Sequence, residues 1–169
     1  MYYTYLESPI GPIFLAGEDE TLAQVSFTTG HQVGEPKAGW VEDTAPLSFA
    51  TQQLDEYFAG DRCRFDLRLA MQGTEFQKRV WETLMTIPFG EAWTYGQIAA
   101  QLGTPGAARA VGRANATNHI PIIVPCHRVI GTNGSLTGFG GGLEAKHWLL
   151  RFEGALAPES RAAGQDALF

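Results

Sequence analysis

Residues 94–116 carry the pattern that most narrows the possible folds of this chain, two short helices joined by a tight turn. Thr94 can cap the first helix, and glycine and proline at 103–106 interrupt the helical pattern before a second helix begins at Ala107. This order predicts a helix-turn-helix. Helix pairs in enzymes also meet at Gly-Pro turns, so the pattern alone leaves DNA binding as one of two interpretations.

The second predicted helix has a nearly flat surface, because it consists of small residues apart from two arginines. Arg109 and Arg113 project from alanines and glycine, and a helix without bulk can lie close to a sugar-phosphate backbone. Close helix packing in a core would use the same small residues, so the alanines remain open to both interpretations. The arginines favour a phosphate-binding surface.

The net charge of −6 argues against a polyanionic partner, but this charge is unevenly distributed. Residues 1–72 contain four basic and eleven acidic residues, a net charge of −7. Residues 73–155 contain seven basic and five acidic residues, a net charge of +2, and residues 156–169 contribute −1. A mildly basic segment of an acidic chain can still provide a local phosphate-binding surface.

The N-terminal residues predict a small antiparallel sheet with one helix. Residues 1–8 read as a strand, residues 13–29 as two strands around an acidic turn, and residues 63–70 as a final strand. Residues 45–60 have apolar side chains at helical spacing and a glycine where a helix C-cap belongs. These positions are Phe49, Leu54, Tyr57, Phe58 and Gly60.

The pattern changes to helices near residues 70–73, where we place a domain boundary. Thr74 can cap a helix with Phe76, Val80, Trp81 and Leu84 on one face, and a last helix would turn Trp148, Leu149 and Phe152 toward the core. We therefore expect an N-terminal domain over 1–72, a C-terminal domain over 73–155 and a loose tail over 156–169.

Asn133 and Gly134 form a further short-range pattern, which lies between Ile130 and Leu136. An Asn-Gly pair flanked by apolar residues is typical of a two-residue hairpin turn. The sequence therefore predicts a β-hairpin at this point.

Cys126 adjoins His127 at the end of an apolar run that Pro125 interrupts. A thiol of ordinary pKa is mostly protonated at neutral pH, so a nucleophilic cysteine needs a base nearby. Adjacent side chains on a strand point to opposite faces, so the pair requires a sharp turn. For an arbitrary Cys-His pair, an inert core cysteine beside a satisfied histidine is the more common interpretation.

The residues around this pair decide between the two interpretations. "PCHRVIG", preceded by "NHIPIIV" and "GAARAVGRAN" and followed by "LTGFGGGLEAKHWLLRFEG", resembles the O6-alkylguanine-DNA alkyltransferases, also called methylated-DNA–protein-cysteine methyltransferases. The resemblance is most specific over residues 73–154. It implies an α/β (α+β) fold with a small N-terminal ribonuclease-H-like sheet domain and a mostly helical C-terminal domain that contains the helix-turn-helix.

The resemblance also implies a reaction, the irreversible, single-use transfer of an alkyl group from O6 of guanine to Cys126. Transfer from O4 of thymine would be less efficient. His127 would act through a water as the base, Glu153 would orient and charge-stabilise His127, and Asn118 would hydrogen-bond around the cysteine turn. Tyr95 would donate a proton or hydrogen bond to the purine, although an aromatic residue at a helix start also packs commonly on a core. No metal or organic cofactor is required.

A base inside a duplex must be flipped out to reach a pocket, and Arg109 matches the family arginine that fills the vacated space. The expected DNA contacts, including the arginine of the flat helix, are Arg109, Tyr95, Gly96, Thr104, Thr132 and Arg113. The expected walls of the base pocket are Asn115, Pro121, Phe139, Gly140 and Gly141, where the two glycines would leave room for the purine edge. The partner would be double-stranded DNA containing O6-alkylguanine.

The chain departs from its relatives at several positions. Many relatives have Asn-Pro where this chain has Asn118-His119, which leaves the role of His119 open. Some relatives bind zinc in the N-terminal domain, but residues 1–70 offer only Cys63 and His31, so we predict no metal. We expect a cytoplasmic protein, because no segment is typical of a signal peptide or a membrane span. We also expect a monomer that could bind DNA cooperatively.

Two other functions fit parts of the pattern. A lesion-binding protein without catalysis would have the same fold but lack the reactive cysteine, and Cys126 counts against it. A cysteine hydrolase would use the same Cys-His pair, but the sequence offers no oxyanion site or substrate cleft for it.

Overall fold

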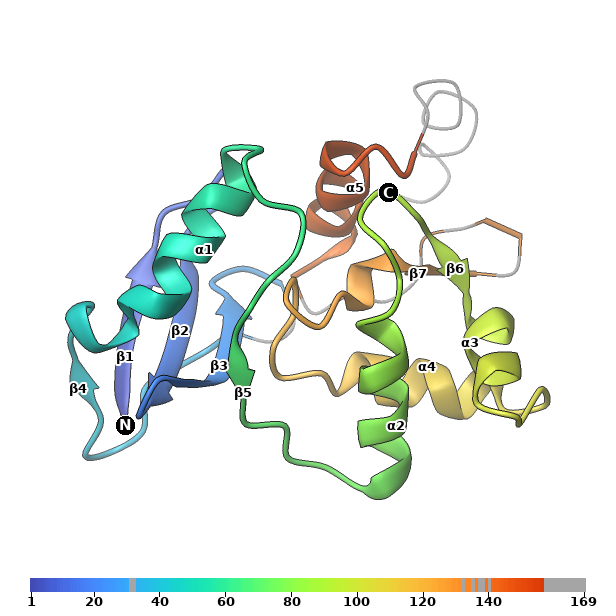
Figure 1. Ribbon diagram of the computed structural model, residues 1–169, viewed down its shortest axis with the longest axis horizontal. Helices are drawn as coiled ribbons and strands as arrows, with labels where there is room; N and C mark the ends of the chain where they lie inside the picture. Colours follow the sequence, from blue (N-terminus) through green and yellow to red (C-terminus); the bar gives the residue numbers. More distant parts are fainter. Residues whose placement is uncertain (31–32, 132, 135, 137–138, 140, 157–169) are drawn as a thin grey trace.

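The structure is a computed structural model that describes residues 1–30, 33–131, 133–134, 136, 139 and 141–156. Figure 1 shows a sheet and one helix from the N-terminal half of the chain beside a group of helices from the C-terminal half. The expected mixed α/β fold, with its N-terminal sheet and helical C-terminal part, is confirmed. The boundary near residues 70–73 stays a prediction, and residues 157–169 of the expected tail lie outside the described residues.

Five strands form the N-terminal sheet in the order β4-β1-β2-β3-β5. Strands β1 and β3 pair antiparallel with β2, whereas β4 and β5 join the two edges in parallel. Positive φ angles at Asp19 and Glu20 allow the tight acidic turn between β2 and β3, as predicted. The bounds are Tyr2–Leu6 (β1), Ile13–Glu18 (β2), Thr21–Phe27 (β3), Val41–Glu42 (β4) and Arg68–Leu69 (β5).

Helix α1 (Ser48–Phe58) lies against one face of this sheet, and a short 3₁₀ turn, Ala45–Leu47, precedes it. The chain leaves the helix through Gly60, whose φ of +84° suits glycine after a helix end, as predicted. The predicted strand over 63–70 is wrong for most of its length. The side chain of Gln53 accepts a hydrogen bond from Asp66 N and donates one to Asp66 O, so a side chain rather than a strand satisfies this backbone.

Four helices build the C-terminal part: α2 (Glu75–Leu84), α3 (Tyr95–Gln101), α4 (Ala108–Ala116) and α5 (Leu143–Phe152). Thr74 and Thr94 each form a capping box with the glutamine three residues on, which confirms both predicted helix starts. Helices α3 and α4 with the turn between them form the predicted helix pair. Among the described residues, no helix is both long and apolar enough to cross a membrane.

At the expected hairpin, Asn133-Gly134, the described residues form a turn in which Gly134 N donates to Gly131 O at 2.8 Å. Strand β7 (Val129–Ile130), which precedes the turn, pairs in parallel with β6 (Trp93–Thr94) at the start of α3. Residues 135 and 137–138 of the predicted return strand lie outside the described residues. The described partner of β7 therefore comes from a distant segment.

The sheet and the helices share one apolar core. Val25 N of β3 donates a hydrogen bond to His119 O at 2.9 Å, and the ring of Phe27 lies 5.2 Å from that of Phe139. On α5, Leu149 is fully buried as predicted, whereas Trp148 and Phe152 are partly buried and pack against Phe58 of α1. The N-terminal sheet thus lies directly against the loops that carry the site.

Candidate functional site

Cys126 lies at the end of a buried loop that the side chain of Asn118 holds in shape. Asn118 Oδ1 accepts a hydrogen bond from Ile120 N at 2.9 Å, and its Nδ2 donates to Val124 O at 2.8 Å. Between these points Ile122 has a φ of +75°, a conformation that costs a β-branched residue energy and that the surrounding contacts must impose. Asn118 thereby shapes the loop that ends at Cys126.

Residues Cys126–Arg128 form a single 3₁₀ turn after Pro125, which is the sharp turn that the Cys-His step requires. The turn separates the side chains of neighbouring residues and keeps all of them buried: His127 is fully inaccessible and Cys126 is 5% exposed. The chain then enters β7 at Val129.

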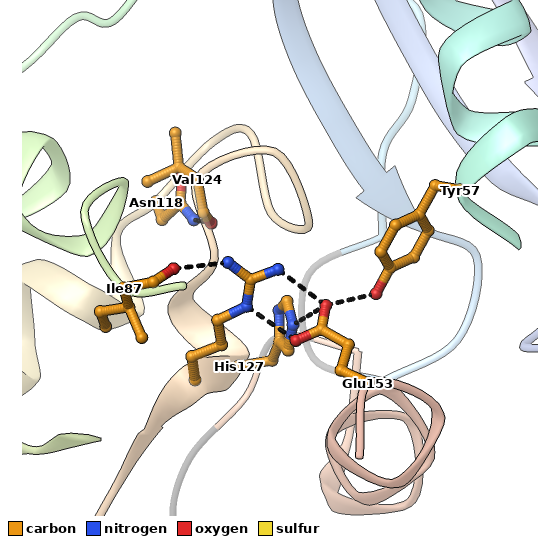
Figure 2. A network of polar contacts seen from close by, with 7 residues as sticks. Tyr57, Ile87, Asn118, Val124, His127 and Glu153 are labelled. Carbon is orange, nitrogen blue, oxygen red and sulfur yellow. Dashed lines mark hydrogen bonds and ion pairs between the residues drawn. The ribbon is translucent and has the colours of Figure 1, made fainter. Parts of the chain in front are cut away.

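His127 and Arg128 both turn toward the carboxylate of Glu153, the residue that ends α5. His127 Nε2 lies 2.9 Å from Glu153 Oε2, and Arg128 donates from Nε to Oε1 at 2.7 Å and from Nη2 to Oε2 at 2.9 Å. Tyr57 of α1 donates to the same Oε2 at 2.6 Å. Figure 2 shows Tyr57 and His127 pointing toward this one carboxylate. The third Arg128 nitrogen, Nη1, donates to Ile87 O at 2.7 Å.

This network fixes the protonation state of Glu153. Burial by itself would raise the pKa of the carboxyl, but the hydrogen bonds of His127 and Arg128 and the positive charge of Arg128 outweigh burial and lower its pKa to about 2. Glu153 is therefore ionised at neutral pH and can only accept hydrogen bonds.

The ionised carboxylate fixes the tautomer of His127 in turn. Because Glu153 Oε2 accepts, Nε2 must carry the proton, and Nδ1 then holds the free lone pair of the neutral ring. Among the described residues Nδ1 has no hydrogen-bond partner. Burial lowers the pKa of His127 against the opposing influence of Glu153, which keeps the ring neutral at physiological pH. A neutral imidazole with a free Nδ1 can accept a proton.

The thiol of Cys126 is protonated at rest, because burial raises its pKa. The hydrogen-bonding side chain of Asn118 and the charge of Lys146 act in the opposite direction. Lys146 is itself fully buried on α5, and its Nζ donates to Val129 O at 2.6 Å. Burial lowers the pKa of Lys146 to about 8, although the Cys126 thiolate would raise it.

Three residues of this site were missed by sequence reasoning, namely Arg128, Lys146 and the hydroxyl of Tyr57. The spacing of Lys146, Leu149, Leu150 and Glu153 is i, i+3, i+4 and i+7, which places the lysine and the glutamate on the buried stripe of α5. That pattern could have identified Lys146. Tyr57 was recognised only as a core residue, and nothing local indicates a partner for its hydroxyl.

The residues predicted to contact DNA lie on and beside the helix pair. Arg109, Arg113 and Thr104 are exposed, while Tyr95 and Gly96 are half-buried at the start of α3. Gly112 of α4 faces the ring of Tyr95: a Cβ atom added to Gly112 would lie 3.8 Å from Cε1 of that ring. The structure thus places Tyr95 of α3 against α4. Thr132, also predicted to contact DNA, lies outside the described residues.

Of the predicted pocket residues, Asn115 contacts the cysteine turn, whereas Phe139 and Gly141 lie against Phe27 of the sheet. Asn115 of α4 is buried and donates to Cys126 O at 3.4 Å, while its Oδ1 has no hydrogen-bond partner among the described residues. Pro121 and Phe139 are buried, and Gly140 lies outside the described residues. The need for glycine at position 141 differs from the one expected, because a Cβ there would come within 2.7 Å of the Phe27 ring. A glycine at 141 makes room for the N-terminal sheet.

The sequence left open the roles of His119 and Cys63. His119 has an exposed side chain at 5.8 Å from the Trp81 ring, and its carbonyl binds Val25 of the sheet. Cys63 is an exposed free thiol. In the described part of the chain, no group of three His, Cys, Asp or Glu residues could hold a metal, and His31 lies outside that part.

Comparison with known proteins finds two family models that together span most of the chain. Residues 1–71 match the model of the 6-O-methylguanine DNA methyltransferase ribonuclease-like domain, and residues 75–155 match that of the DNA-binding domain of the same family.

Individual relatives are similar over nearly their full length. A methylated-DNA–protein-cysteine methyltransferase of Methanosarcina acetivorans is 54% identical over 155 residues, which cover 92% of this chain and 99% of the relative. The Mycobacterium tuberculosis protein of the same name is 50% identical over 159 residues, covering 94% and 95%. The crystal structure of Mycobacterium tuberculosis OGT in complex with DNA superposes with a TM-score of 0.85 at 48% identity, covering 95% of this chain and 98% of that one.

Replacing Arg128 by methionine should destabilise the fold strongly. The substitution leaves the Glu153 carboxylate buried without its main counter-charge, which costs about 3–5 kcal/mol for a broken buried ion pair. Chemical denaturation measures this loss in the free energy of unfolding. The matched control is Arg151→Met on the exposed side of α5, which should change it by less than about 0.5 kcal/mol. Equal effects of the two substitutions would contradict the central role of Arg128.

The free energy of unfolding should fall as the pH is lowered from about 5 toward 2. Glu153 has a pKa lowered from 4.5 to about 2 in the folded protein, so its stabilising contribution is present above pH 4.5 and is lost as the folded form is protonated. This contribution is about 3 kcal/mol. Denaturation curves between pH 7 and 2 measure it, and Glu153→Gln should flatten the pH dependence. Glu42→Gln on the sheet edge is the control and should not.

Proposed function

The chain belongs to the 6-O-methylguanine DNA methyltransferase family, and from this premise we propose that it repairs DNA by direct reversal. The substrate is O6-alkylguanine in double-stranded DNA, with O4-alkylthymine a poorer one. The alkyl group moves irreversibly to Cys126, so that each molecule acts once. The observation that carries this proposal is the buried arrangement of Cys126 beside His127, whose ring is kept neutral by burial and hydrogen-bonds through Nε2 to Glu153.

The proposed step balances with the groups present in the site. Nδ1 of His127 takes the proton of the Cys126 thiol through a bridging water, and Sγ attacks the alkyl carbon. A carbon–sulfur bond forms while the bond from carbon to O6 breaks, and its electron pair stays on the guanine. The guanine gains one proton, which Tyr95 donates or assists by a hydrogen bond to the purine. The proton that His127 took from the thiol then passes on through water and restores the resting site, so that one proton leaves the thiol and one reaches the guanine. The products are guanine and an S-alkylcysteine.

Protonation states in the resting site fit this sequence of events. Glu153 is ionised, so it stabilises the imidazolium that forms when His127 accepts the proton. The positive charge of Lys146 and the side chain of Asn118 stabilise the thiolate that remains on Cys126. The charge separation that the reaction requires is therefore supported at both ends, in a site from which bulk water is excluded.

Binding to DNA would use the helix pair and its small-residue surface. Arg109 projects from α4, where alanine and glycine allow close approach to the minor groove, and it would occupy the space that the flipped nucleotide leaves. Tyr95, Gly96, Thr104, Thr132 and Arg113 would contact the backbone. The complex of Mycobacterium tuberculosis OGT with DNA supports DNA as the partner. The flipped base would then lie against Asn115, Pro121, Phe139, Gly140 and Gly141.

Incubation with duplex DNA containing O6-methylguanine should raise the intact mass of the protein by one methyl group in place of hydrogen, in a one-to-one ratio. Peptide mass spectrometry should locate the methyl group on Cys126. Cys126→Ser should abolish transfer because an alcohol at neutral pH is a far weaker nucleophile than a thiolate. Cys63→Ser is the matched control and should transfer normally. Binding without a mass gain would instead indicate a lesion-binding protein, and repeated turnover would indicate a hydrolase.

Arg109→Ala should lower the rate of transfer from duplex DNA much more than the rate from a single strand. Unstacking a duplex nucleotide costs a few kcal/mol, and an arginine that fills its place offsets part of that cost. We expect a duplex-specific decrease of about tenfold or more in single-turnover rates, since 1.4 kcal/mol corresponds to tenfold. Arg151→Ala serves as the charge-matched control. An equal decrease on both substrates would assign Arg109 to general phosphate binding.

A further inference from the structure

Tyr57 connects the N-terminal half of the chain to the reactive network. It lies on α1, 96 residues before Glu153 in the sequence, and its hydroxyl donates a 2.6 Å hydrogen bond to Glu153 Oε2. Both side chains are buried, and Tyr57 is fully inaccessible. The contact therefore joins the helix that covers the sheet to the residue that ends α5.

The hydroxyl of Tyr57 shares its acceptor atom with the proposed base. Glu153 Oε2 accepts from Tyr57 Oη at 2.6 Å, from Arg128 Nη2 at 2.9 Å and from His127 Nε2 at 2.9 Å, whereas Oε1 accepts from Arg128 Nε. Burial, and next the negative charge of Glu153, raise the pKa of Tyr57, so the phenol stays protonated and acts only as a donor. Because these donors share one oxygen, each hydrogen bond to Oε2 weakens the attraction of this oxygen for the other donors.

The ring of Tyr57 is held rigidly enough to aim this hydroxyl. Four aromatic rings surround it from both halves of the chain, with centroid distances of 5.1–6.1 Å. They belong to Phe58, Phe65, Phe89 and Phe152. Close packing of this kind restricts the ring to one orientation, and Figure 2 shows the hydroxyl directed at the carboxylate.

We propose that Tyr57 is a positioning residue for alkyl transfer, which fixes Oε2 of Glu153 and limits how strongly this carboxylate attracts the proton of His127. The inference rests on the proposed function. It assigns to the N-terminal half a direct part in the chemistry, through one hydrogen bond.

The direction of the effect follows from the charges that face His127. These are Glu153 and Lys146 from α5, and Arg128 and Cys126 from its own turn, while Tyr57 acts through Glu153. Without the hydroxyl, Oε2 loses a donor and carries more charge toward His127 Nε2. The imidazolium is then better stabilised, so the pKa of His127 rises.

Because only the neutral ring can accept the thiol proton, this rise has a specific kinetic signature. In Tyr57→Phe the acid limb of the pH–rate profile should move to higher pH by about half a unit to one unit. On that limb the transfer rate falls about threefold to tenfold, whereas the rate above it changes less. A loss of folded protein would lower the rate by the same factor at every pH.

The experiment compares single-turnover transfer from O6-methylguanine duplex DNA between pH 5 and 8.5 in the full-length wild type and in variants. The first control is Tyr3→Phe, which removes a hydroxyl from an exposed tyrosine–glutamate pair of the N-terminal sheet, where Tyr3 Oη donates to Glu42 at 3.5 Å. Phe65→Leu disturbs the packing of the Tyr57 ring but removes no hydroxyl. Only Tyr57→Phe should shift the limb. An unshifted limb in Tyr57→Phe, or an equal shift in Phe65→Leu, overturns the proposal.

A second measurement without DNA separates this inference from the proposed function. Titration of ¹⁵N-labelled histidine by NMR, with His127→Gln to assign the signal, follows the protonation of His127 directly. The midpoint in Tyr57→Phe should rise by the same half unit to one unit. An unchanged midpoint overturns the inference even if transfer occurs. A wild type that binds the duplex but does not methylate Cys126 defeats the proposed function, and with it the part of Tyr57 in the chemistry.

Discussion

The carboxylate of Glu153 is the point on which the structure of the site depends. It is a buried charge, and burial of a charge is costly unless opposite charge and hydrogen bonds compensate for it. Four donor hydrogen atoms supply that compensation, from Tyr57, His127 and Arg128. These residues come from α1 and from the turn that carries Cys126, while Glu153 ends α5. The carboxylate is stable only when all three segments are in place, so the assembly of the fold also assembles the base.

The same burial controls the thiol. Burial keeps Cys126 protonated at rest, and a thiol is a much weaker nucleophile than a thiolate. In the proposed reaction His127 therefore accepts the thiol proton, and the ionised Glu153 stabilises the resulting imidazolium. Lys146 adds a positive charge near the sulfur without being an exposed cation itself, because it is fully buried and donates to Val129 O. A cysteine in this setting is selective for an electrophile placed directly against it.

Sequence patterns predicted the features that local chemistry determines. The helix N-caps at Thr74 and Thr94, the acidic turn at Asp19 and the sharp turn at Cys126 each depend on residues a few positions apart, and all of them were anticipated. The strand predicted over 63–70 was wrong because Gln53, on a different element, satisfies the backbone of Asp66. The roles of Glu153, Asn118 and Arg109 came from family resemblance, since helical spacing can place Glu153 on the buried stripe of α5 but does not identify its partners.

Contacts across the two halves explain what the N-terminal sheet contributes. Val25 holds the carbonyl of His119 at the start of the cysteine loop, and Phe27 packs on Phe139 and fills the space that Gly141 leaves free. Tyr57 reaches the carboxylate at the far end of the same network. The sheet thus contacts the loop before the cysteine and the wall beside the expected base pocket, and helix α1 contacts the carboxylate that hydrogen-bonds to His127. A strained loop with Ile122 at positive φ keeps its shape only under such constraints, so the sheet acts as the rigid support against which the reactive turn is held.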